Sequence, residues 1–381
     1  MTGQPTATEE LLGESVSFAR AREQSAFDAL AGRARKKIVL FGAGRLGIKT
    51  LHALRDAGEE PLAFADNDAN KVGSSVEGIE VFSLEKAARL FRDEGIFIVT
   101  TWRPEGGGMF ERLRCLSSLR CDIIGSYITA GWRFDGILPH FAAERPSRLL
   151  EHRDELIAAA GVWSDSTSME IFRQQLAWRL RGEFHGVSAP VGNQYFPEEI
   201  DGLNSSELFV DCGAFDGDTI QSIHWPIERV IAIEPDPVSA AKLRSRLRSG
   251  DSLHQVLVGE TQGIANFNAE GTMASARSDS GLLSVPMTTL DALLQHEEPT
   301  FIKLDVEGDE MPALRGALRT LTRTQPVVAV CAYHRPDDIW EIPLFLKRLL
   351  PENKMLLRAH AFDGFELVVY SIPPSRMLRC P

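Results

Sequence analysis

The sequence predicts an α/β protein built around two parallel β-sheets. Its 381 residues suffice for two domains at roughly 100 to 200 residues each. In two stretches, beginning near Lys37 and near Leu208, short apolar segments alternate with helical segments of about 10 to 15 residues, which is the pattern of a parallel sheet. Each stretch opens with a glycine-rich turn between an apolar segment and a helix. With 44 % hydrophobic and 25 % charged residues, the chain has ample material for hydrophobic cores.

Charge and hydropathy exclude several classes of protein. The 53 acidic and 41 basic side chains give a net charge of −12, which repels a polyanion, so we expect no nucleic-acid partner. The longest apolar runs, such as Pro326–Ala332, are far shorter than the roughly 18 to 20 residues that cross a bilayer, so we expect no membrane span. Glu9, Glu10 and Glu14 stand where a secretory signal needs a basic start and an apolar middle.

The cysteines favour a reducing compartment. They are odd in number and include no Cys-x-x-Cys pair, which argues against a disulfide framework and against a zinc site. The five are Cys115, Cys121, Cys212, Cys331 and Cys380. We therefore expect a cytoplasmic protein. Separately, we expect its partner to be a small molecule, and its oligomeric state stays open.

The first part of the chain divides into two predicted segments. Residues 1–35 are expected to form N-terminal helices, because apolar residues recur there at helical spacing among charges. Residues 36–135 alternate strand and helix and predict a small Rossmann-like α/β domain. Its expected strands are Ile38–Phe41, Leu62–Ala65, Ile96–Thr100 and Ile123–Ile128, and its expected helices are Leu46–Asp56 and Ser83–Arg92.

Residues 136–203 are expected to form a helical connector without strands. Ser164 or Asp165 can cap a helix that runs to Arg181. The loop that follows, residues 182–202, is rich in Gly, Pro and Asn and is a candidate lid.

Residues 204–381 predict a second, doubly wound parallel sheet that ends in an antiparallel hairpin. The expected strands are Leu208–Val210, Val230–Ile233, Gln255–Val258, Phe301–Leu304 and Val327–Ala332, with helices after Asp218, Val238 and Asp309. Near the C-terminus, Lys354–Ala361 and Phe365–Ile372 flank Asp363 and Gly364. This pair favours a tight reversal of the chain because glycine readily takes a positive φ.

The first glycine loop has the pattern of a dinucleotide fingerprint. Gly42, Gly44 and Gly47 lie between an apolar strand and a helix, and Asp66 ends the next strand. Such glycines let a pyrophosphate approach the backbone at the helix N-terminus, while the acid accepts ribose hydroxyls. Arg45 adds positive charge, so this loop suits phosphate.

Three interpretations of this first loop stay open. It binds a nucleotide or nucleotide-linked substrate, it binds a nicotinamide dinucleotide, or it is a scaffold without a ligand. A full dinucleotide domain needs two βαβαβ halves, and residues 36–130 supply barely more than one, which counts against hydride chemistry.

The second glycine loop, residues 211–219, has the opposite electrostatics. Asp211, Asp216 and Asp218 place three carboxylates where a pyrophosphate needs none, so repulsion opposes a phosphorylated ligand and favours a cationic one. S-adenosylmethionine is such a ligand, with a sulfonium, an ammonium and no phosphate. Glu234 follows Asp211 by 23 residues, the position of a ribose-binding acid at the end of a second strand.

These residues resemble the FkbM-type S-adenosylmethionine-dependent methyltransferases. The matching motifs, between Tyr195 and Pro373, are DCGAFDGDT at 211–219, EPD at 234–236, KLDVEGDE at 303–310, ALRGA at 313–317 and YHRPDD at 333–338. The resemblance implies a class I methyltransferase fold and, usually, O-methylation of a small molecule or glycan. Residues 1–194 lie largely outside it.

The expected cofactor is S-adenosylmethionine. The residues expected to bind it are Asp211, Gly213, Ala214, Phe215, Gly217, Thr219, Glu234, Asp236, Val258 and Asp305. Val258 is expected to end the third strand and to face adenine, by analogy with ligands at the carboxyl ends of strands. Tyr195 and Phe196 precede the loop and are candidates to cover adenine or substrate, with ordinary packing as the alternative. The polar loop Thr272–Ser275 is a candidate contact or a plain surface loop.

Asp305, Glu307 and His334 are the candidate catalytic residues. Asp305 ends the fourth strand beside the switch point of the sheet, and Glu307 could face the same side. His334 ends the neighbouring strand, and a histidine of near-neutral pKa can remove the acceptor's proton. Hard ligands at these three positions suit magnesium, but we predict no metal. Asp309 is interpreted as a helix N-cap.

The leading hypothesis is a methyltransferase that uses S-adenosylmethionine to methylate an oxygen of a small-molecule or sugar-type acceptor. One rival is an NAD(P)-binding oxidoreductase that uses the Gly42 loop. The other is a non-catalytic ligand-binding or scaffolding protein in which both loops survive only as parts of the fold.

Overall fold

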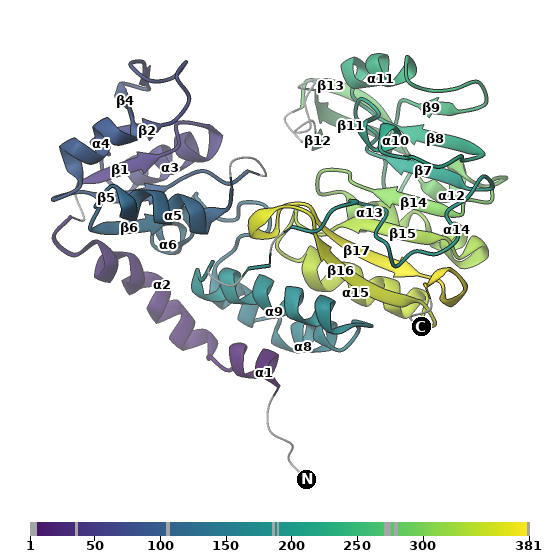
Figure 1. Ribbon diagram of the computed structural model, residues 1–381, viewed down its shortest axis with the longest axis horizontal. Coiled ribbons are helices and arrows are strands. Elements are labelled where there is room, and N and C mark those ends of the chain that lie inside the picture. Colours follow the sequence, from purple (N-terminus) through teal and green to yellow (C-terminus); the bar gives the residue numbers. More distant parts are fainter. Residues whose placement is uncertain are drawn as a thin grey trace, which may run out of the picture. The chain divides into compact units, whose positions relative to one another are not determined.

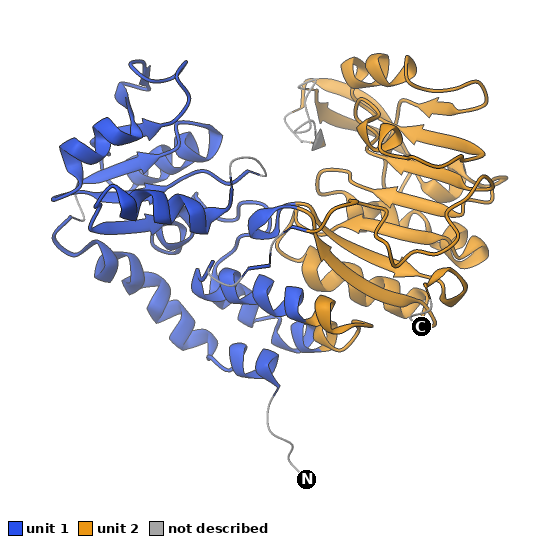
Figure 2. Ribbon diagram, in the orientation of Figure 1, with its two compact units in different colours: residues 1–157, 170–190, 361–365 blue, residues 158–169, 191–360, 366–381 orange. Residues whose placement is uncertain are grey.

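The computed structural model describes residues 6–34, 37–103, 107–184, 187–188, 190–269, 276–277 and 281–378. The polar loop Thr272–Ser275 lies outside these residues. The chain divides into two compact units (Figure 2). Unit 1 comprises residues 1–157, 170–190 and 361–365, and unit 2 comprises residues 158–169, 191–360 and 366–381.

Unit 1 contains a six-stranded sheet in the order β3-β4-β2-β1-β5-β6. Its strands are β1 (Ile38–Phe41), β2 (Ala63–Asp66), β3 (Ser75–Val76), β4 (Ile79–Ser83), β5 (Ile96–Val99) and β6 (Ile123–Ser126). All neighbours pair in parallel except β3 with β4, and β1 and β5 are buried throughout. The predicted parallel sheet is confirmed, but β3 and β4 were not predicted and the last strand was predicted too long. That strand ends at Ser126 because Tyr127 already begins a helix, whose Thr129 hydroxyl accepts the Ser126 amide.

The helices that begin in the first half of the chain include two that were not predicted, Met109–Ser118 and Tyr127–Arg133. The helices are α1 (Ala7–Leu11), α2 (Val16–Ala31), α3 (Arg45–Asp56), α4 (Leu84–Phe91), α5 (Met109–Ser118), α6 (Tyr127–Arg133), α7 (Pro146–Leu150), α8 (Arg153–Ala160) and α9 (Ser166–Arg181), with the 3-10 turn η1 (Gly32–Ala34). Ser83 caps α4 through the Lys86 amide, and Asp165 caps α9 through the Ser168 amide at 2.6 Å. Both caps were predicted from sequence.

Unit 2 contains a seven-stranded sheet in the order β16-β17-β15-β14-β7-β8-β9 (Figure 1). Its strands are β7 (Leu208–Cys212), β8 (Arg229–Ile233), β9 (Ser252–His254), β14 (Phe301–Leu304), β15 (Val327–Cys331), β16 (Lys354–Ala359) and β17 (Leu367–Ile372). Only β17 is antiparallel to its neighbours. The doubly wound sheet and the C-terminal hairpin are both confirmed. The hairpin turn places Asp363 at φ 58° and Gly364 at φ 79°.

The prediction for the third strand of this sheet is wrong. The strand is β9 at Ser252–His254, not Gln255–Val258. It lies at the sheet edge and is only half-buried, so its composition is more polar than that of the apolar segment that follows. Leu257–Val258 instead forms β10 in a second, four-stranded sheet, in the order β10-β13-β11-β12. The other strands of this sheet are β11 (Gly263–Asn268), β12 (Ala276–Arg277) and β13 (Leu283–Thr288).

The remaining helices connect the strands of unit 2. They are α10 (Asp218–Gln221), α11 (Pro237–Arg244), α12 (Leu290–Leu293), α13 (Glu310–Arg315), α14 (Leu318–Thr324) and α15 (Asp338–Leu349), with 3-10 turns η2 (Phe362–Gly364) and η3 (Pro374–Arg376). Because the strand order reverses at β7, the carboxyl ends of β7 and β14 flank the crevice where such sheets bind ligands.

Two further findings bear on the sequence predictions. Among the described residues, no helix is both long and apolar enough to cross a membrane. The cysteines in the described part of the chain, Cys115, Cys121, Cys212 and Cys331, are free thiols, and Cys380 lies outside it.

Candidate functional site

The candidate site lies in unit 2, where the carboxyl ends of four neighbouring strands, β8, β7, β14 and β15, meet. The turn after β7 passes directly against the end of β14. A Cβ atom at Gly213 would lie 1.7 Å from the Asp305 carbonyl oxygen, and Gly213 has a φ of 75°. Only glycine fits such an approach. Phe215 at φ 45° and Gly217 at φ 90° continue this turn into α10.

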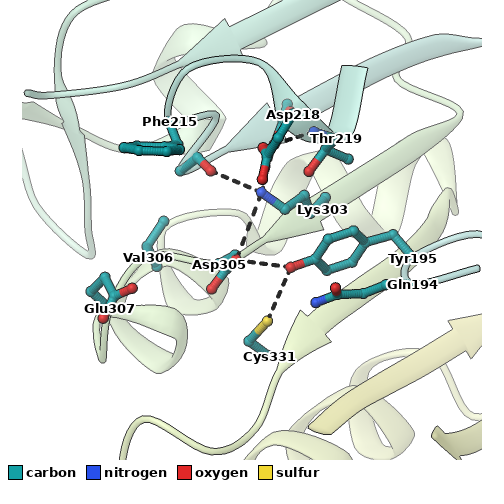
Figure 3. A network of polar contacts seen from close by, with 12 residues as sticks. Gln194, Tyr195, Phe215, Asp218, Thr219, Lys303, Asp305, Val306, Glu307 and Cys331 are labelled. Atoms are coloured by element: carbon teal, nitrogen blue, oxygen red, sulfur yellow. Dashed lines mark hydrogen bonds and ion pairs between the residues drawn. The ribbon is translucent and has the colours of Figure 1, made fainter. Parts of the chain in front are cut away.

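A buried lysine lies at the centre of the site (Figure 3). Lys303 Nζ donates to Asp211 Oδ1 at 2.9 Å and to the Gly213 carbonyl at 2.8 Å, and it lies 3.9 Å from Asp305 Oδ2. The Lys303 and Asp211 side chains are 2 % and 0 % exposed. Burial lowers the pKa of Lys303, but the Asp211 and Asp305 carboxylates outweigh it and raise this pKa above its usual value. Burial raises the pKa of Asp211 to about 6.

Sequence reasoning missed Lys303. The signal that could have found it is the register of two strands, because Lys303 on β14 pairs with Asp211 on β7. Opposite charges thus occupy matching positions on two otherwise apolar strands that a doubly wound sheet places side by side.

Glu234 follows β8 and holds the backbone of the glycine turn. Its carboxylate accepts the Phe215 amide at 2.8 Å and the Asp236 amide at 2.7 Å. Burial raises the pKa of Glu234 to about 7. Each carboxylate oxygen keeps a further acceptor position, as a ribose contact requires. Asp236 accepts the Val238 and Ser239 amides at 2.8 and 3.1 Å, so its carboxylate caps α11.

Asp305 follows β14 and receives contacts from three sides. The Tyr195 hydroxyl donates to Asp305 Oδ2 at 2.8 Å and lies 3.5 Å from Cys331 Sγ (Figure 3). His334 Nε2 lies 3.6 Å from Asp305 Oδ1. Burial alone would raise the pKa of Asp305, but Lys303 and His334 reverse this effect and lower it. Asp305 therefore stays ionised near neutral pH.

His334 is buried among carboxylates. Its Nδ1 lies 2.8 Å from Glu310 Oε1, and its Nε2 lies 3.7 Å from Glu307 Oε2. Burial favours the neutral ring, but Glu310, Glu307 and Asp305 together raise the pKa of His334 well above its usual value. An imidazole that already carries both protons cannot accept another, which is unfavourable for the general base expected at His334. Burial raises the pKa of Glu307 to about 8.

The other acids of the glycine loop are largely compensated. Asp216 forms an ion pair with Arg246 at 2.8 Å, and the exposed Asp218 accepts the Thr219 amide. Asp309 occupies the N-cap position of α13, as expected, but its carboxylate makes no cap hydrogen bond. It forms ion pairs instead, at 3.1 Å with Arg277 and 3.5 Å with Arg335.

The remaining residues that were predicted to bind the cofactor lie in two places, the glycine loop and the smaller sheet. The amides of Gly213 and Ala214 both donate to the Ile233 carbonyl, and Thr219 lies buried in α10, so the loop begins against the end of β8. Val258 is buried in β10 of the smaller sheet, because the strand that was expected to place it in the main sheet is β9.

Two groups of described side chains could hold a metal ion. Asp305, Glu307 and His334 form one, and Asp305, Cys331 and Glu366 form the other; within each, the ligand atoms lie within 4.8 Å of one another. Carboxylate and imidazole ligands are also common in hydrogen-bonded and ion-paired clusters such as this one.

Comparison with known proteins finds a family match that lies mostly within unit 2. Residues 211–362 match the family model of the methyltransferase FkbM domain. The chain contains an FkbM domain. No curated protein matches the chain.

The fold extends beyond the FkbM domain. The chain is similar to the crystal structure of methyltransferase FkbM from Methylobacillus flagellatus KT, with a TM-score of 0.75 and 22 % identity over 96 % of this chain and 97 % of that one. This similarity shows the shared fold, including the α/β arrangement that precedes the FkbM domain. UDP-D-quinovosamine 4-dehydrogenase from Vibrio fischeri matches at a TM-score of 0.21 and 22 % identity over 24 % of this chain and 76 % of that one. An rRNA methylase from Streptococcus thermophilus matches at a TM-score of 0.28 and 12 % identity over 46 % of this chain and 90 % of that one.

Outside the FkbM domain, the three glycines of the first loop have different environments. Gly42 has a φ of 124°, and a Cβ there would lie 2.3 Å from the Thr101 hydroxyl. A Cβ at Gly47 would lie 1.9 Å from the Gly42 carbonyl, whereas nothing lies within 4 Å of one at Gly44. The first glycine thus makes the turn, the third allows close packing and the second leaves an open face, as in a phosphate-binding loop.

Asp66 and Arg45 also take the predicted positions. Asp66 ends β2 and accepts the Ala43 amide of the glycine loop at 2.8 Å and the Asp68 amide at 2.9 Å. Lys71 Nζ lies 3.3 Å from its Oδ2. Burial raises the pKa of Asp66, but these amides and Lys71 outweigh burial and lower this pKa below its usual value. Arg45 is exposed at the first position of α3.

Proposed function

We propose that this protein transfers a methyl group from S-adenosylmethionine to an oxygen of a small-molecule or sugar-type acceptor. The observation that carries the proposal is the juxtaposition of Glu234, Asp305 and the Gly213 turn at the switch point of a sheet in an FkbM domain. A buried acid at the end of the second strand and an ionised acid at the end of the fourth match the two polar requirements of this cofactor, ribose hydroxyls and positive charge.

The residues present fit the cofactor. Gly213 places no side chain between the turn and the end of β14, where a Cβ would lie 1.7 Å from the Asp305 carbonyl oxygen. Glu234 would accept the ribose hydroxyls, and Phe215, whose amide it holds, would lie beside the nucleoside. Asp305 would face the cationic end, since its own ionised form is held by Lys303 and Tyr195.

Methyl transfer is an in-line displacement that needs alignment more than covalent catalysis. S-adenosylmethionine supplies a methyl group already activated by its sulfonium. The task of this chain is to orient the acceptor oxygen behind that methyl group and to remove its proton. Asp305 and Glu307 lie in the segment after β14, within 4 Å of His334 after the neighbouring β15, where they can hold acceptor hydroxyls. The acidity of this end of the sheet favours neutral or cationic acceptors over nucleic acids and other polyanions.

Calorimetry with S-adenosylhomocysteine tests the cofactor assignment. We expect stoichiometric binding to the full chain, and Glu234→Ala should weaken it by an order of magnitude or more. Glu260→Gln is the matched control, because Glu260 is an exposed acid of the same unit whose one ion pair, to Arg315, is long at 3.7 Å. No binding by the intact protein would refute the proposal. Transfer of radiolabel from S-adenosylmethionine to the small-molecule fraction of a cell extract then separates an enzyme from a non-catalytic binder.

We further propose that the Gly42 loop holds the phosphate of a single nucleotide, as part of a nucleotide-linked acceptor. Side chains pack after β5, in the half of the sheet edge that a dinucleotide would need. Asp363 Oδ2 accepts the Met109 amide at 2.5 Å at the start of α5, and the ring of Phe365 packs at 4.4 Å from Trp102, just after β5. Crowding there favours a mononucleotide over NAD(P).

Ligand titrations distinguish binding of a mononucleotide from binding of NAD(P). UDP or ADP should bind the full chain, and Gly44→Val, which fills the open face of the loop, should abolish that binding without changing binding of S-adenosylhomocysteine. Enhancement or quenching of NADH fluorescence that Gly44→Val removes would instead favour the oxidoreductase hypothesis.

A further inference from the structure

Two arginines meet at the segment that follows β14. Arg277 lies on β12 of the smaller sheet, and Arg335 follows β15 of the main sheet. Their Nη2 atoms lie 3.1 and 3.5 Å from the same atom, Asp309 Oδ1. Two parts of the chain that are far apart in sequence thus bring guanidinium groups to one carboxylate, in the segment that also carries Asp305 and Glu307.

The backbone of this segment makes room for Arg335. Gly308 has a φ of 98°, and a Cβ there would lie 3.1 Å from Arg335 Nε. The Arg335 side chain therefore lies against Gly308, the residue between Glu307 and Asp309. A glycine at this position lets the guanidinium group approach the backbone closely.

The Asp309 carboxylate does not use up the donors of the two arginines. No described residue donates a hydrogen bond to Asp309 Oδ1, although both Nη2 atoms are close and the side chain is only 7 % exposed. An arginine that serves as a carboxylate partner frequently makes two parallel hydrogen bonds to it. Among the described residues, the guanidinium of Arg277 donates only to Met287 Sδ, a weak acceptor at 3.9 Å, and that of Arg335 to none. The Arg277 and Arg335 side chains are 39 % and 55 % exposed, so both stay accessible to a ligand.

The charges of this group do not balance. Asp309 offsets one of the two guanidinium charges, and the arginines have no other ion-pair partner in the part of the chain that the structure describes. Two like charges that share one counter-charge repel each other and leave a net positive charge. A second anion would remove both effects. The planar fork of arginine suits the paired oxygens of a carboxylate or a phosphate.

We propose that Arg277 and Arg335 bind an acidic group, a carboxylate or a phosphate, of the methyl acceptor. The inference rests on the proposed function and names the class of its acceptor. The order of the strands favours the acceptor over the cofactor as the ligand. Arg335 follows β15, whereas the glycine turn and Glu234 follow β7 and β8, on the other side of β14.

The site then divides the acceptor into two ends. The Asp305 carboxylate at the end of β14 disfavours an anion there, so the neutral hydroxyl belongs at that end and the acidic group at the arginines. A single acidic group also differs from the polyanions that the net charge of −12 repels.

Arginine NMR with inorganic phosphate as the probe tests the site without an acceptor. In the full chain, isotope-labelled at arginine nitrogen, the Nε–H signals are assigned by their loss in Arg277→Gln and Arg335→Gln. Both signals should shift along one saturating curve as phosphate is added, with ionic strength held constant by sodium chloride. In Arg335→Gln, the Arg277 signal should need about tenfold more phosphate, the low end of what a hydrogen bond between charged groups contributes.

Arg319 provides the matched control. It is an exposed arginine of the same unit whose Nε lies 3.5 Å from Asp291 Oδ2, and among the described residues no second arginine pairs with that carboxylate. Its signal should not saturate, and Arg319→Gln should leave the phosphate curve of Arg277 unchanged. Signals of Arg277 and Arg335 that shift no more than that of Arg319, or that follow two unrelated curves, overturn the proposal.

Calorimetry with S-adenosylhomocysteine separates the acceptor from the cofactor, whose own carboxylate has the same chemistry. Arg277→Gln and Arg335→Gln should leave its affinity unchanged. A loss of about tenfold in either variant would place the cofactor's carboxylate at the arginines and overturn the assignment to the acceptor. Absence of binding by the wild-type protein would refute the proposed function, whereas the phosphate titration would still report on the arginine pair.

Kinetics and the charge of the product test the acceptor class. With the small-molecule fraction of a cell extract, Arg335→Gln should raise the amount of extract needed for half-maximal methyl transfer about tenfold with little change in the maximal rate, and Arg335→Lys should restore part of the loss. The labelled product should bind an anion-exchange resin at neutral pH. Phosphatase treatment then distinguishes a phosphate monoester, which it removes, from a carboxylate. A labelled product that does not bind the resin, or an Arg335→Gln protein that depends on extract as the wild type does, refutes the acceptor class.

Discussion

Replacing Lys303 with methionine would isolate the effect of the buried charge at the centre of the FkbM domain. Methionine is nearly as long as lysine and fills a similar volume, so packing should change little. The variant loses the ion pair to Asp211 at 2.9 Å and the hydrogen bond to the Gly213 carbonyl at 2.8 Å. What remains is the Asp211 carboxylate, 0 % exposed and without its cation.

The expected cost follows from this geometry. Removing one partner of a buried ion pair typically destabilises a protein by about 3 to 5 kcal/mol, because the other charge stays buried and uncompensated. Lys303→Met combined with Asp211→Asn removes both charges and should cost clearly less than Lys303→Met alone. The deficit of the single variant should also shrink as pH falls, since an unpaired buried carboxylate escapes its penalty by taking a proton.

Hydrogen exchange provides the measurement. The amides of β7 and β14 report the free energy of opening within unit 2, so the transition of unit 1 does not interfere. Lys242→Met is the matched control, since Lys242 is exposed on α11. A Lys303→Met protein within about 1 kcal/mol of wild type would refute the reasoning, because even the low end of the range for a broken buried pair exceeds this. So would a double variant as unstable as the sum of the two single variants.

Three further predictions concern the same site. Burial raises the pKa of Glu307 from 4.5 to about 8, so between these pH values the folded protein holds a proton that the unfolded chain releases. The melting temperature measured by calorimetry should therefore rise as pH falls from about 8 to 6. A melting temperature that falls over this range would contradict the assignment. Gly213→Ala, whose Cβ would lie 1.7 Å from the Asp305 carbonyl, should cost about 3 kcal/mol or more and abolish binding of S-adenosylhomocysteine, whereas Gly250→Ala, at a φ of 102° with nothing within 4 Å, should cost about 1 kcal/mol in urea denaturation. Tyr195→Phe should cost about 1.5 to 3 kcal/mol by the same measurement, since it removes a hydrogen bond to an ionised carboxylate; no change would show that this bond contributes nothing.

Most of the fold could be predicted because its signals are local. Buried parallel strands appear as short apolar runs, and β1, β7, β8, β14 and β15 all lie where such runs predict them. The turn at Asp363 and Gly364 follows from the positive φ that these residues tolerate. The predicted position of the third strand was wrong because β9 is a half-buried edge strand. The more apolar segment after it, which forms β10, matched the pattern of a buried strand better.

The candidate site was predictable at the level of segments but not of contacts. The acidic segment after β14 was identified, yet the partner of each acid depends on tertiary structure. His334 suggested a base because a free histidine titrates near neutral pH, whereas the carboxylates of Glu310, Glu307 and Asp305 outweigh burial and raise its pKa. Tyr195 was a candidate to cover a ligand, with ordinary packing as the alternative, and neither interpretation pointed to the hydrogen bond from its hydroxyl to Asp305. Such roles follow from which groups share one buried volume, which a linear pattern does not encode.

The structure also changes where the site's preference for a cation originates. Two of the three acids of the glycine loop do not supply it, because Lys303 pairs with Asp211 and Arg246 pairs with Asp216; the third, Asp218, is exposed. A further ionised carboxylate lies one strand further on, at Asp305, whereas burial raises the pKa of Glu307 to about 8 and so favours its protonated form near neutral pH. A positively charged donor would therefore be drawn to the end of β14, where Asp305 lies. Electrostatic selection of the donor and alignment of the acceptor would then depend on the same few carboxylates.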